Sequence, residues 1–203
     1  MYVTKITPIT KTRYQIWVDG TPAFVLYKAE VSKYNLAEGM CLSEDVFTQI
    51  KEVLIKRAKL RALHLLEEMD RTEQSIFQKL RQNGYPEDVV GAAVSYVKSF
   101  GYLNDKRYAE SYVRSRMHKK SRRELYMALL GKGLQSETVE EALNLCYENM
   151  SEKEAIMQIV KKKNFNVEEA DDREKKKIFD YLLRKGFRYE DIRQVLQVSC
   201  SNT

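Results

Sequence analysis

Three glycines mark an internal repeat in this chain of 203 residues, and the repeat leaves few folds open. The segments around Gly84, Gly133 and Gly186 align when the sequence is shifted by 49 and then by 53 residues. Each segment has an apolar pair, a leucine, the glycine, a short turn and an amphipathic helix pattern. The aligned segments are IFQKLRQNGYPEDVVGAAV from Ile76, LYMALLGKGLQSETVEEAL from Leu125 and IFDYLLRKGFRYEDIRQVL from Ile178.

A weaker helical pattern precedes each segment, so every repeat has three helices. We expect a mainly α fold built from three tandem three-helix, helix-turn-helix-like repeats. A unit of about 45 residues buries little core alone, so the units should stack into an elongated, curved array. The leading helices cover residues 60–66, 108–113 and 155–160, and the repeats cover residues 43–103, 104–150 and 151–203.

Residues 1–42 predict a small N-terminal β-hairpin region. Tyr14, Ile16 and Val18 alternate with mostly polar neighbours, Asp19-Gly20 is a strong turn signal, and residues 23–27 supply the returning strand. A lone hairpin is marginally stable in water. It should therefore pack on the helices, on a further strand from residues 5 to 10, or on a partner.

Helix start signals divide the rest of the chain. Ser43 is placed as the N-cap of one long helix, or of two joined helices, whose apolar stripe runs from Val46 through Ile50 and Leu54 to Leu60 and Leu66. Serine, threonine or asparagine also precedes five later helical segments, and the three repeat glycines stand where helices should stop. The further predicted N-caps are Thr72, Asn104, Ser121, Ser136 and Ser151, with capping boxes at Ser121 and Ser151.

Positive charge is concentrated in the second repeat. The whole chain has a formal net charge of +6, and residues 105–133 alone carry nine basic and three acidic side chains. Such a cluster suits a phosphate backbone or an acidic protein groove, although a solvated corner between helices is the alternative. The candidate contacts are Arg114, Arg116, Lys119, Lys120, Arg122 and Arg123, together with Tyr112, which could stack on bases or pack in the core.

Other polar features have ordinary structural explanations. Asn104 and Asp105 fit a helix N-cap followed by a first-turn carboxylate. Residues 161–163 and 175–177 form secondary lysine patches, which we interpret as a solvated face.

Several classes of protein are disfavoured. No segment is apolar enough to span a membrane and the first residues lack a signal-peptide core, so we expect a cytoplasmic protein. Cys41, Cys146 and Cys200 lack metal-site or disulfide spacing, and the histidines are only two. Metalloprotease, phosphate-loop and serine-hydrolase motifs are absent from the sequence. We expect a monomer that is not an enzyme and needs no cofactor or metal.

The motifs that join the repeats resemble those of the RecX family. GYLNDKRYA at residues 101–109 resembles the signature between the first and second repeats, and residues 183–192 are similar to the third-repeat ending. The run at residues 69–76 departs from the family pattern at Met69 and Ser75, while Arg71 and Thr72 match it. The motif residues, for which we expect mainly structural roles, are Gly101, Tyr102, Leu103, Asn104, Asp105, Arg107, Ala109, Lys132, Gly133, Gly186 and Phe187.

This resemblance implies a regulator of DNA repair and the SOS response. A RecX-type protein is expected to bind the RecA filament on DNA and to limit its growth, ATP turnover and strand exchange. It is also expected to bind single- and double-stranded DNA weakly and without sequence specificity.

Two other functions remain open on the residues alone. One is a sequence-specific helix-turn-helix DNA-binding regulator, although no repeat has a last helix rich in Arg, Asn and Gln together. The other is a helical scaffold for another protein. DNA binding that is sequence-independent and strongly salt-dependent would argue against the first, and absence of DNA affinity would favour the second.

Overall fold

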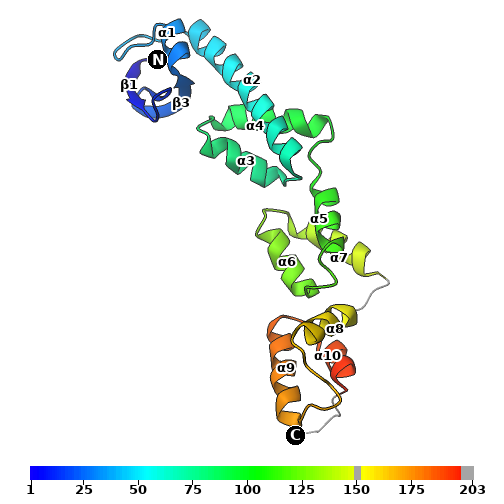
Figure 1. Ribbon diagram of the computed structural model, residues 1–203. Coiled ribbons are helices and arrows are strands. Elements are labelled where there is room, and N and C mark those ends of the chain that lie inside the picture. Colours follow the sequence, from blue (N-terminus) through cyan, green and yellow to red (C-terminus); the bar gives the residue numbers. More distant parts are fainter. Residues whose placement is uncertain (149–151, 198–203) are drawn as a thin grey trace. The chain divides into compact units, whose positions relative to one another are not determined.

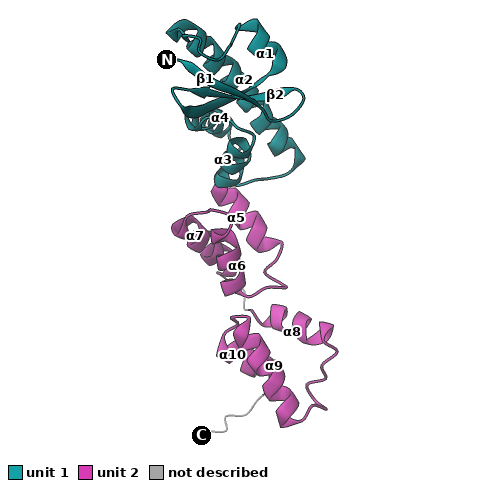
Figure 2. Ribbon diagram, turned by 90° about the vertical axis from the view of Figure 1, so that its left-hand side faces the viewer, with its two compact units in different colours: residues 1–103 teal, residues 104–203 magenta. Residues whose placement is uncertain are grey.

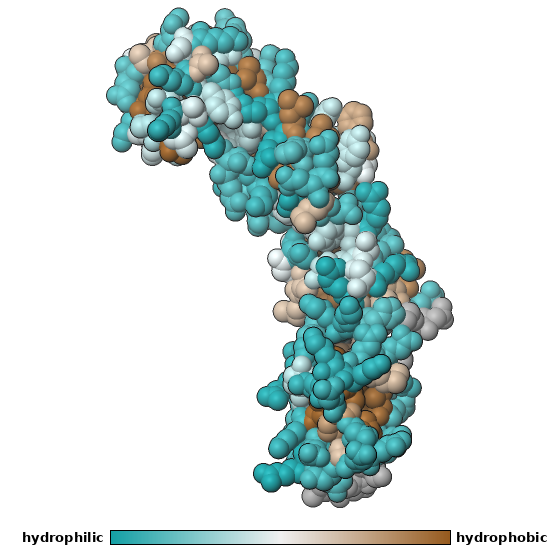
Figure 3. Space-filling view, viewed as in Figure 1, coloured by the Kyte–Doolittle hydropathy of each residue, from teal (hydrophilic) through white to brown (hydrophobic). Residues whose placement is uncertain are grey.

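The chain forms two compact units, residues 1–103 and 104–203 (Figures 1 and 2). The computed structural model describes residues 1–148 and 152–197. Within these residues it has ten helices and one three-stranded sheet, which confirms the expected mainly helical class with a small N-terminal β region. Hydrophilic side chains cover most of the face shown in Figure 3, and apolar side chains form separate small patches.

The N-terminal sheet contains the predicted hairpin and one more strand. Its antiparallel strands are β1 (Val3–Pro8), β2 (Arg13–Val18) and β3 (Thr21–Tyr27), in that spatial order. Asp19 and Gly20 both have positive φ, 47° and 80°, as a tight hairpin turn with primed geometry requires. The hairpin packs on β1 and, through the fully buried Ile16 and Leu26, on the helices. Strand β1 begins two residues earlier than the predicted strand at residues 5–10.

A short helix after β3 corrects our expectation of a purely β-rich start. Helix α1 (Lys28–Lys33) begins where the Glu30 side chain accepts a hydrogen bond from the backbone N–H of Tyr27 at 2.8 Å. Glu30 also forms an ion pair with Arg57. Six residues are too few to produce a helical period in the sequence, which explains why the pattern missed this element.

One long helix, α2 (Glu44–Glu68), organises the first unit. It begins at Ser43, whose Oγ accepts the N–H of Val46 at 3.4 Å, and α3 (Glu73–Gln82) and α4 (Glu87–Ser99) pack against it. The predicted stripe is wrong at Leu60, which is 68% exposed. Ala58 and Ala62 are fully buried instead, because α4 lies against this half of α2 and small residues allow the close approach. Leu60 points to the other side, about 200° around the helix from Ala58.

The second unit contains two three-helix groups, each with its own core. Leu125, Leu129 and Leu143 are central to the first, and Ile156 and Leu182 to the second. The sheet and α2 to α4 instead share one core in the first unit. The helices of the second unit are α5 (Asp105–Arg114), α6 (Arg122–Leu130), α7 (Ser136–Tyr147), α8 (Lys153–Lys162), α9 (Asp172–Arg184) and α10 (Tyr189–Leu196).

Most predicted helix starts are confirmed. Thr72, Asn104 and Ser121 each accept a backbone N–H as N-cap, and Ser121 forms its capping box with Glu124. The predicted N-cap at Ser136 is wrong by one position, since Ser136 is the first residue of α7 and the residue before it is the N-cap. Ser151 lies outside the described residues. A further capping box, Asp171 with Glu174, was not predicted from the sequence.

The three repeat glycines end helices with positive φ, as predicted: 86° at Gly84, 83° at Gly133 and 86° at Gly186. Two of them also allow close packing. A Cβ on Gly84 would lie 2.4 Å from Val25 Cγ2 on β3, and a Cβ on Gly186 would lie 2.7 Å from Arg123 Cδ on α6. In the first and third repeats, the turn is therefore also the point where a neighbouring element docks.

Candidate nucleic-acid interface

The predicted basic run spans the end of α5, a loop and the first turn of α6. In its first part the Arg116 guanidinium lies 4.0 Å from the centroid of the Tyr112 ring, and Lys132, from the turn after α6, places its ammonium 5.4 Å from the same centroid. Tyr112 is half-buried against the second-repeat core and stacks on Tyr108, with centroids 6.2 Å apart. The ring thus has both packing and cationic partners within the chain. Arg114 is exposed at the end of α5.

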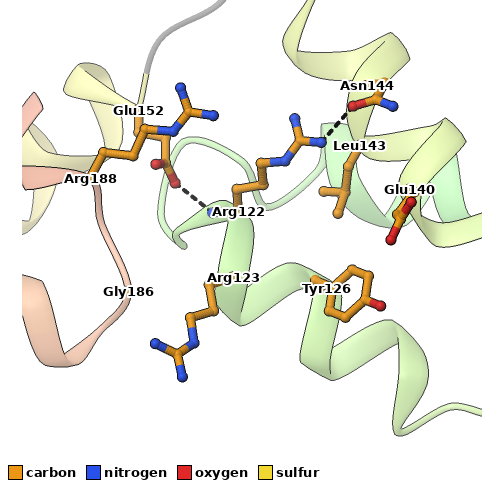
Figure 4. Close-up of a pocket in the computed structure, with 9 residues that line it drawn as sticks. All are labelled: Arg122, Arg123, Tyr126, Glu140, Leu143, Asn144, Glu152, Gly186 and Arg188. Carbon is orange, nitrogen blue, oxygen red and sulfur yellow. Dashed lines mark hydrogen bonds between the residues drawn. The ribbon is translucent and has the colours of Figure 1, made fainter. Parts of the chain in front are cut away.

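The last part of the run lies where the second repeat meets the third, a contact we call the inter-repeat seam (Figure 4). The seam joins the N-terminus of α6 to Glu152 and to the turn at Lys185 and Gly186. The Arg122 N–H donates to Glu152 Oε1 at 2.5 Å, and Ser121 Oγ donates to the Lys185 carbonyl at 2.6 Å. Two candidate cations therefore have structural contacts: Arg122 donates to the Asn144 side chain at 2.6 Å, and the aliphatic part of Arg123 faces Gly186.

Burial controls the ionisable groups of the seam. Glu152 is 5% exposed, and burial raises the pKa of its carboxyl, while hydrogen bonds from the backbone N–H groups of Arg122 and Arg188 oppose the shift. Burial likewise raises the pKa of the Tyr147 hydroxyl, which has no hydrogen-bond partner among the described residues. Glu152 belongs to the packing of the seam, and Tyr147 lies beside it, with the Arg122 guanidinium 5.7 Å from its ring centroid.

The seam also brings together a larger cationic surface, which we call the lysine groove. It is a hollow of about 870 Å³ lined by five lysines around one tyrosine ring. Lysines come from the end of α8, from the end of α9 and from the loop before α6, so both repeats contribute. The groove consists of Lys119, Lys161, Lys162, Lys163, Lys185 and Tyr181, with Gln158 and Ile159 completing its lining.

Tyr181 forms the aromatic floor of the lysine groove. Its ring packs against the third-repeat core, with the Lys163 and Lys185 ammonium groups 4.2 and 5.6 Å from its centroid. Lys185 pairs with Glu124 at 3.0 Å, and this hydrogen bond raises the pKa of Lys185. In the described part of the chain, the other four lysines of the groove form no ion pair. The groove therefore presents uncompensated positive charge.

A second hollow adjoins the lysine groove at Lys163 and Tyr181. It encloses about 460 Å³ and adds Lys177 and Arg184, with Glu174 as its single carboxylate. The cationic surface of the third repeat is thus larger than the groove alone.

This arrangement suits an anionic polymer. Lysine ammonium groups act as point charges without the fixed bidentate geometry of arginine, so they attract phosphates without reading sequence. A half-buried tyrosine between them adds a flat surface for a base or sugar.

Sequence reasoning singled out only Lys119 of this set. Residues 161–163 were interpreted as a solvated face, Lys185 was noted only within the third-repeat ending at residues 183–192, and Tyr181 was given no functional role. Lysines in the last turn of a helix are ordinary, because they offset the helix dipole, and so they carried no distinctive signal. The signal that could have predicted the groove is Tyr181, an aromatic residue on the helix that follows the lysine triplet at residues 161–163.

The motif residues between the repeats occupy structural positions. Gly101 has φ of 73°, Leu103 is buried in the first core and Ala109 in the second. Asn104 Oδ1 accepts the Arg107 N–H at 2.9 Å, with Asp105 in the first turn of α5, and Phe187 belongs to the third core. Tyr102 is 54% exposed and stacked on Phe100, and Arg107 and Lys132 are also exposed.

The described residues contain no group of three or more His, Cys, Asp or Glu side chains placed to hold a metal ion. None of their helices has the length and apolar character needed to cross a membrane.

The fold and the groove define a class: a tandem three-helix-repeat protein with a cationic surface and an N-terminal sheet. Models of the three RecX three-helix domains match residues 58–96, 104–143 and 151–196, in the order first, second and third. The chain belongs to the RecX family.

Relatives and solved structures agree with this assignment. The chain is 32% identical to the regulatory protein RecX of Caldanaerobacter subterraneus subsp. tengcongensis, covering 98% of this chain and 100% of the relative. It is 26% identical to that of Clostridium perfringens (strain SM101 / Type A), covering 94% and 91%. A crystal structure of RecX from Lactobacillus salivarius has a TM-score of 0.60 at 27% identity, covering 72% of this chain and 96% of that one. A further crystal structure of regulatory protein RecX has a TM-score of 0.61 at 24% identity, covering 97% and 99%.

Proposed function

We propose that this protein regulates the RecA recombinase by binding the RecA filament on DNA and limiting its growth, ATP turnover and strand exchange. Membership of a family of regulatory proteins supports a regulator. The observation that carries the proposal is the lysine groove, whose uncompensated charge suits the phosphates of a nucleoprotein filament. The protein acts in the cytoplasm as a monomer, without a cofactor and without catalysing a reaction.

Both the lysine groove and the basic run contribute residues to the contact with the nucleoprotein filament. Lys161, Lys162 and Lys163 face the DNA backbone, while Arg116 and Lys120 extend the same positive surface along the second repeat. Arg123 contributes mainly by packing between the repeats, and the Arg122 side chain by its bond to Asn144 within the second repeat. Weak, sequence-independent binding of single- and double-stranded DNA follows from contacts that are electrostatic and not directed at base edges.

The first experiment measures ATP hydrolysis by the cognate RecA on single-stranded DNA while this protein is added. Inhibition well below one protein per RecA supports filament capping or groove binding. If equimolar protein in low salt leaves ATP hydrolysis unchanged, the RecA proposal is wrong and a scaffold for another protein becomes the better explanation.

A matched pair of variants tests the groove. Lys161→Gln with Lys162→Gln removes two charges from the groove, and Arg173→Gln with Lys176→Gln removes two from exposed positions of α9 in the same repeat. The first pair should weaken DNA binding and reduce the salt slope for single strands by about 1.4, at about 0.7 per lost phosphate contact. The control pair should behave as the wild type. Equal salt slopes for all three proteins would remove the groove from the mechanism.

A second set tests the basic run. Arg116→Ala, Lys119→Ala and Lys120→Ala together should weaken DNA and filament binding in a folded protein, as judged by circular dichroism. Unchanged binding would restrict the contact to the third repeat. Comparing random and defined DNA sequences in the same assay separates this proposal from a sequence-specific regulator, which would bind one sequence far more tightly than others.

A further inference from the structure

A second cationic hollow, which we call the arginine pocket, lies in the first unit, far in sequence from the lysine groove. It encloses about 260 Å³ between the N-terminal sheet, α2 and the turn after α3. Three arginines and two tyrosines contribute to its lining. Its polar residues are Arg13, Arg57, Arg61, Asn83, Tyr27 and Tyr85.

Two of the three arginines are held in place by the fold. Arg13 donates to the Asn83 carbonyl at 2.6 Å, which ties β2 to the end of α3. Arg57 pairs with Glu30 and stacks over Tyr27, 4.5 Å from the ring centroid. Arg61 follows Arg57 by one helical turn on α2 and is half-buried. The guanidinium groups thus come from two separate elements and meet at one hollow.

The arginine pocket has an excess of two positive charges. Among the described residues, Glu30 is the only carboxylate in an ion pair with any of the three arginines. Holding like charges together costs free energy unless a partner relieves the repulsion. The Arg13 contact with a neutral carbonyl orients that guanidinium but leaves its charge uncompensated.

Tyr85 adds a hydroxyl donor to the same hollow. Burial raises the pKa of this hydroxyl despite the three arginines, so it keeps its proton at neutral pH and can donate a hydrogen bond. Gly84 beside it has no side chain, and a Cβ there would clash with Val25, so the turn that carries Tyr85 lies directly against β3. The wall of the pocket is therefore built by the fold.

We propose that the arginine pocket binds a terminal phosphate group, the dianion of a phosphomonoester or of a pyrophosphate end. Two excess positive charges match a group that carries about −1.5 to −2 at neutral pH better than they match a phosphodiester. Guanidinium groups bind phosphate oxygens through paired hydrogen bonds, and the Tyr85 hydroxyl supplies another donor. The group comes either from a free nucleotide or from the 5′ end of a DNA strand.

The test measures binding of two probes, inorganic pyrophosphate and a deoxynucleoside 5′-monophosphate, to the full chain. Isothermal titration calorimetry in low salt gives the affinity of each. Arg61→Gln should weaken binding about tenfold or more, as expected for loss of charge-assisted hydrogen bonds. Lys56→Gln, which removes one charge from an exposed position of the same helix, should bind as the wild type does. The proposal is overturned if the wild type shows no saturable binding of either probe, or if Arg61→Gln binds as tightly as the wild type.

Further variants and probes complete the design. Should Arg61→Gln fail to fold, Arg61→Lys and Tyr85→Phe replace it, each removing hydrogen-bond donors at little cost in volume, and unchanged binding in both overturns the proposal. A 5′-phosphorylated oligonucleotide that binds more tightly than its 5′-hydroxyl counterpart assigns the site to DNA ends. Equal binding of the two oligonucleotides, with the small probes still bound, assigns it to free nucleotides. The lysine groove contributes equally to both oligonucleotides, so its own test stays separate.

Discussion

Gly186 is subject to two constraints at once, one on its backbone conformation and one on the space around it. Its φ of 86° is strained for a residue with a side chain, and a Cβ would meet Arg123 across the inter-repeat seam. The atoms it would meet include Arg123 Cβ at 2.8 Å, which rotation of the arginine side chain cannot move, so α6 itself would have to shift. The backbone conformation at Gly186 cannot change without altering the turn before α10.

We therefore expect Gly186→Ala to lower the free energy of unfolding of the third repeat by about 1–3 kcal/mol. Gly91→Ala is the control, because Gly91 lies inside α4 and a Cβ there would have no neighbour within 4 Å. That change should stabilise the first unit by about 0.5–1 kcal/mol. Urea unfolding followed by circular dichroism measures both, and a neutral Gly186→Ala would show that the turn tolerates a side chain.

Glu152 should make the stability of the second unit depend on pH. Because its folded pKa is raised above the ordinary value of 4.5, the folded state binds the proton more tightly than the unfolded state does. Its contribution therefore favours folding at low pH and is lost as pH rises from about 4.5 through the folded pKa. The stability difference between the wild type and Glu152→Gln, measured by urea unfolding, should shift against the wild type over this window. Parallel pH profiles would contradict the assignment.

At the scale of residues, local signals predicted what depends on local geometry. Thr72 and Asn104 could be identified as helix caps because a cap acts on an amide three residues away. Arg123 could not be separated from its neighbours in the basic run, since the residue it packs on, Gly186, is far along the chain. A charged side chain looks the same in a sequence whether its partner is solvent or another repeat.

Among the helices, α6 shows how one N-terminus can serve two purposes. Ser121 is fully buried, caps α6 through the Glu124 N–H at 3.1 Å and also donates to the Lys185 carbonyl in the next repeat. Ser43 caps α2 from an exposed position, through one contact at 3.4 Å. Ser43 therefore only caps its helix, whereas Ser121 caps its helix and also forms a hydrogen bond to the next repeat.

Ser121→Ala should cost more than Ser43→Ala. Loss of a cap alone costs about 1 kcal/mol, and Ser121→Ala also removes the hydrogen bond to the Lys185 carbonyl, which adds about 1–3 kcal/mol. Thermal and urea unfolding of the two variants gives the comparison. Similar losses would mean that the Lys185 carbonyl finds another donor when Ser121 is absent.

Helix patterns predicted the elements well but not the surfaces they form together. Apolar periodicity predicted the long α2, and the serine before it predicted the N-cap. The six-residue α1 is too short to give a helical period. The lysine groove depends on three segments separated by tens of residues, so no single helix pattern contained it.

For the molecule as a whole, the single tryptophan gives a probe of one unit. Trp17 lies on β2, and the buried core of residues 3–103 is distinct from the two cores that follow. Tryptophan fluorescence should therefore follow only the unfolding of the first unit, while circular dichroism follows all the helices.

Gly186→Ala should then move the two signals apart. The circular dichroism transition should shift to lower urea concentration, and the tryptophan transition should stay where it is in the wild type. A shift of the fluorescence transition by the same amount would show that the whole chain unfolds as one cooperative unit.

The repeat period and the N-terminal hairpin were both evident from the sequence. The merging of the sheet and the first three-helix repeat into one core was not, because it depends on Val25 meeting Gly84 and on Arg13 reaching Asn83. Contacts at that sequence separation have no local pattern.

The two cationic hollows differ in the chemistry of their side chains. All five cations of the groove are lysines, and all three of the pocket are arginines. Primary amines react with acetylating reagents, whereas guanidinium groups react with dicarbonyls such as phenylglyoxal. Each surface can consequently be labelled without touching the cations of the other, and mass spectrometry of protected sites would show which surface a bound nucleic acid covers.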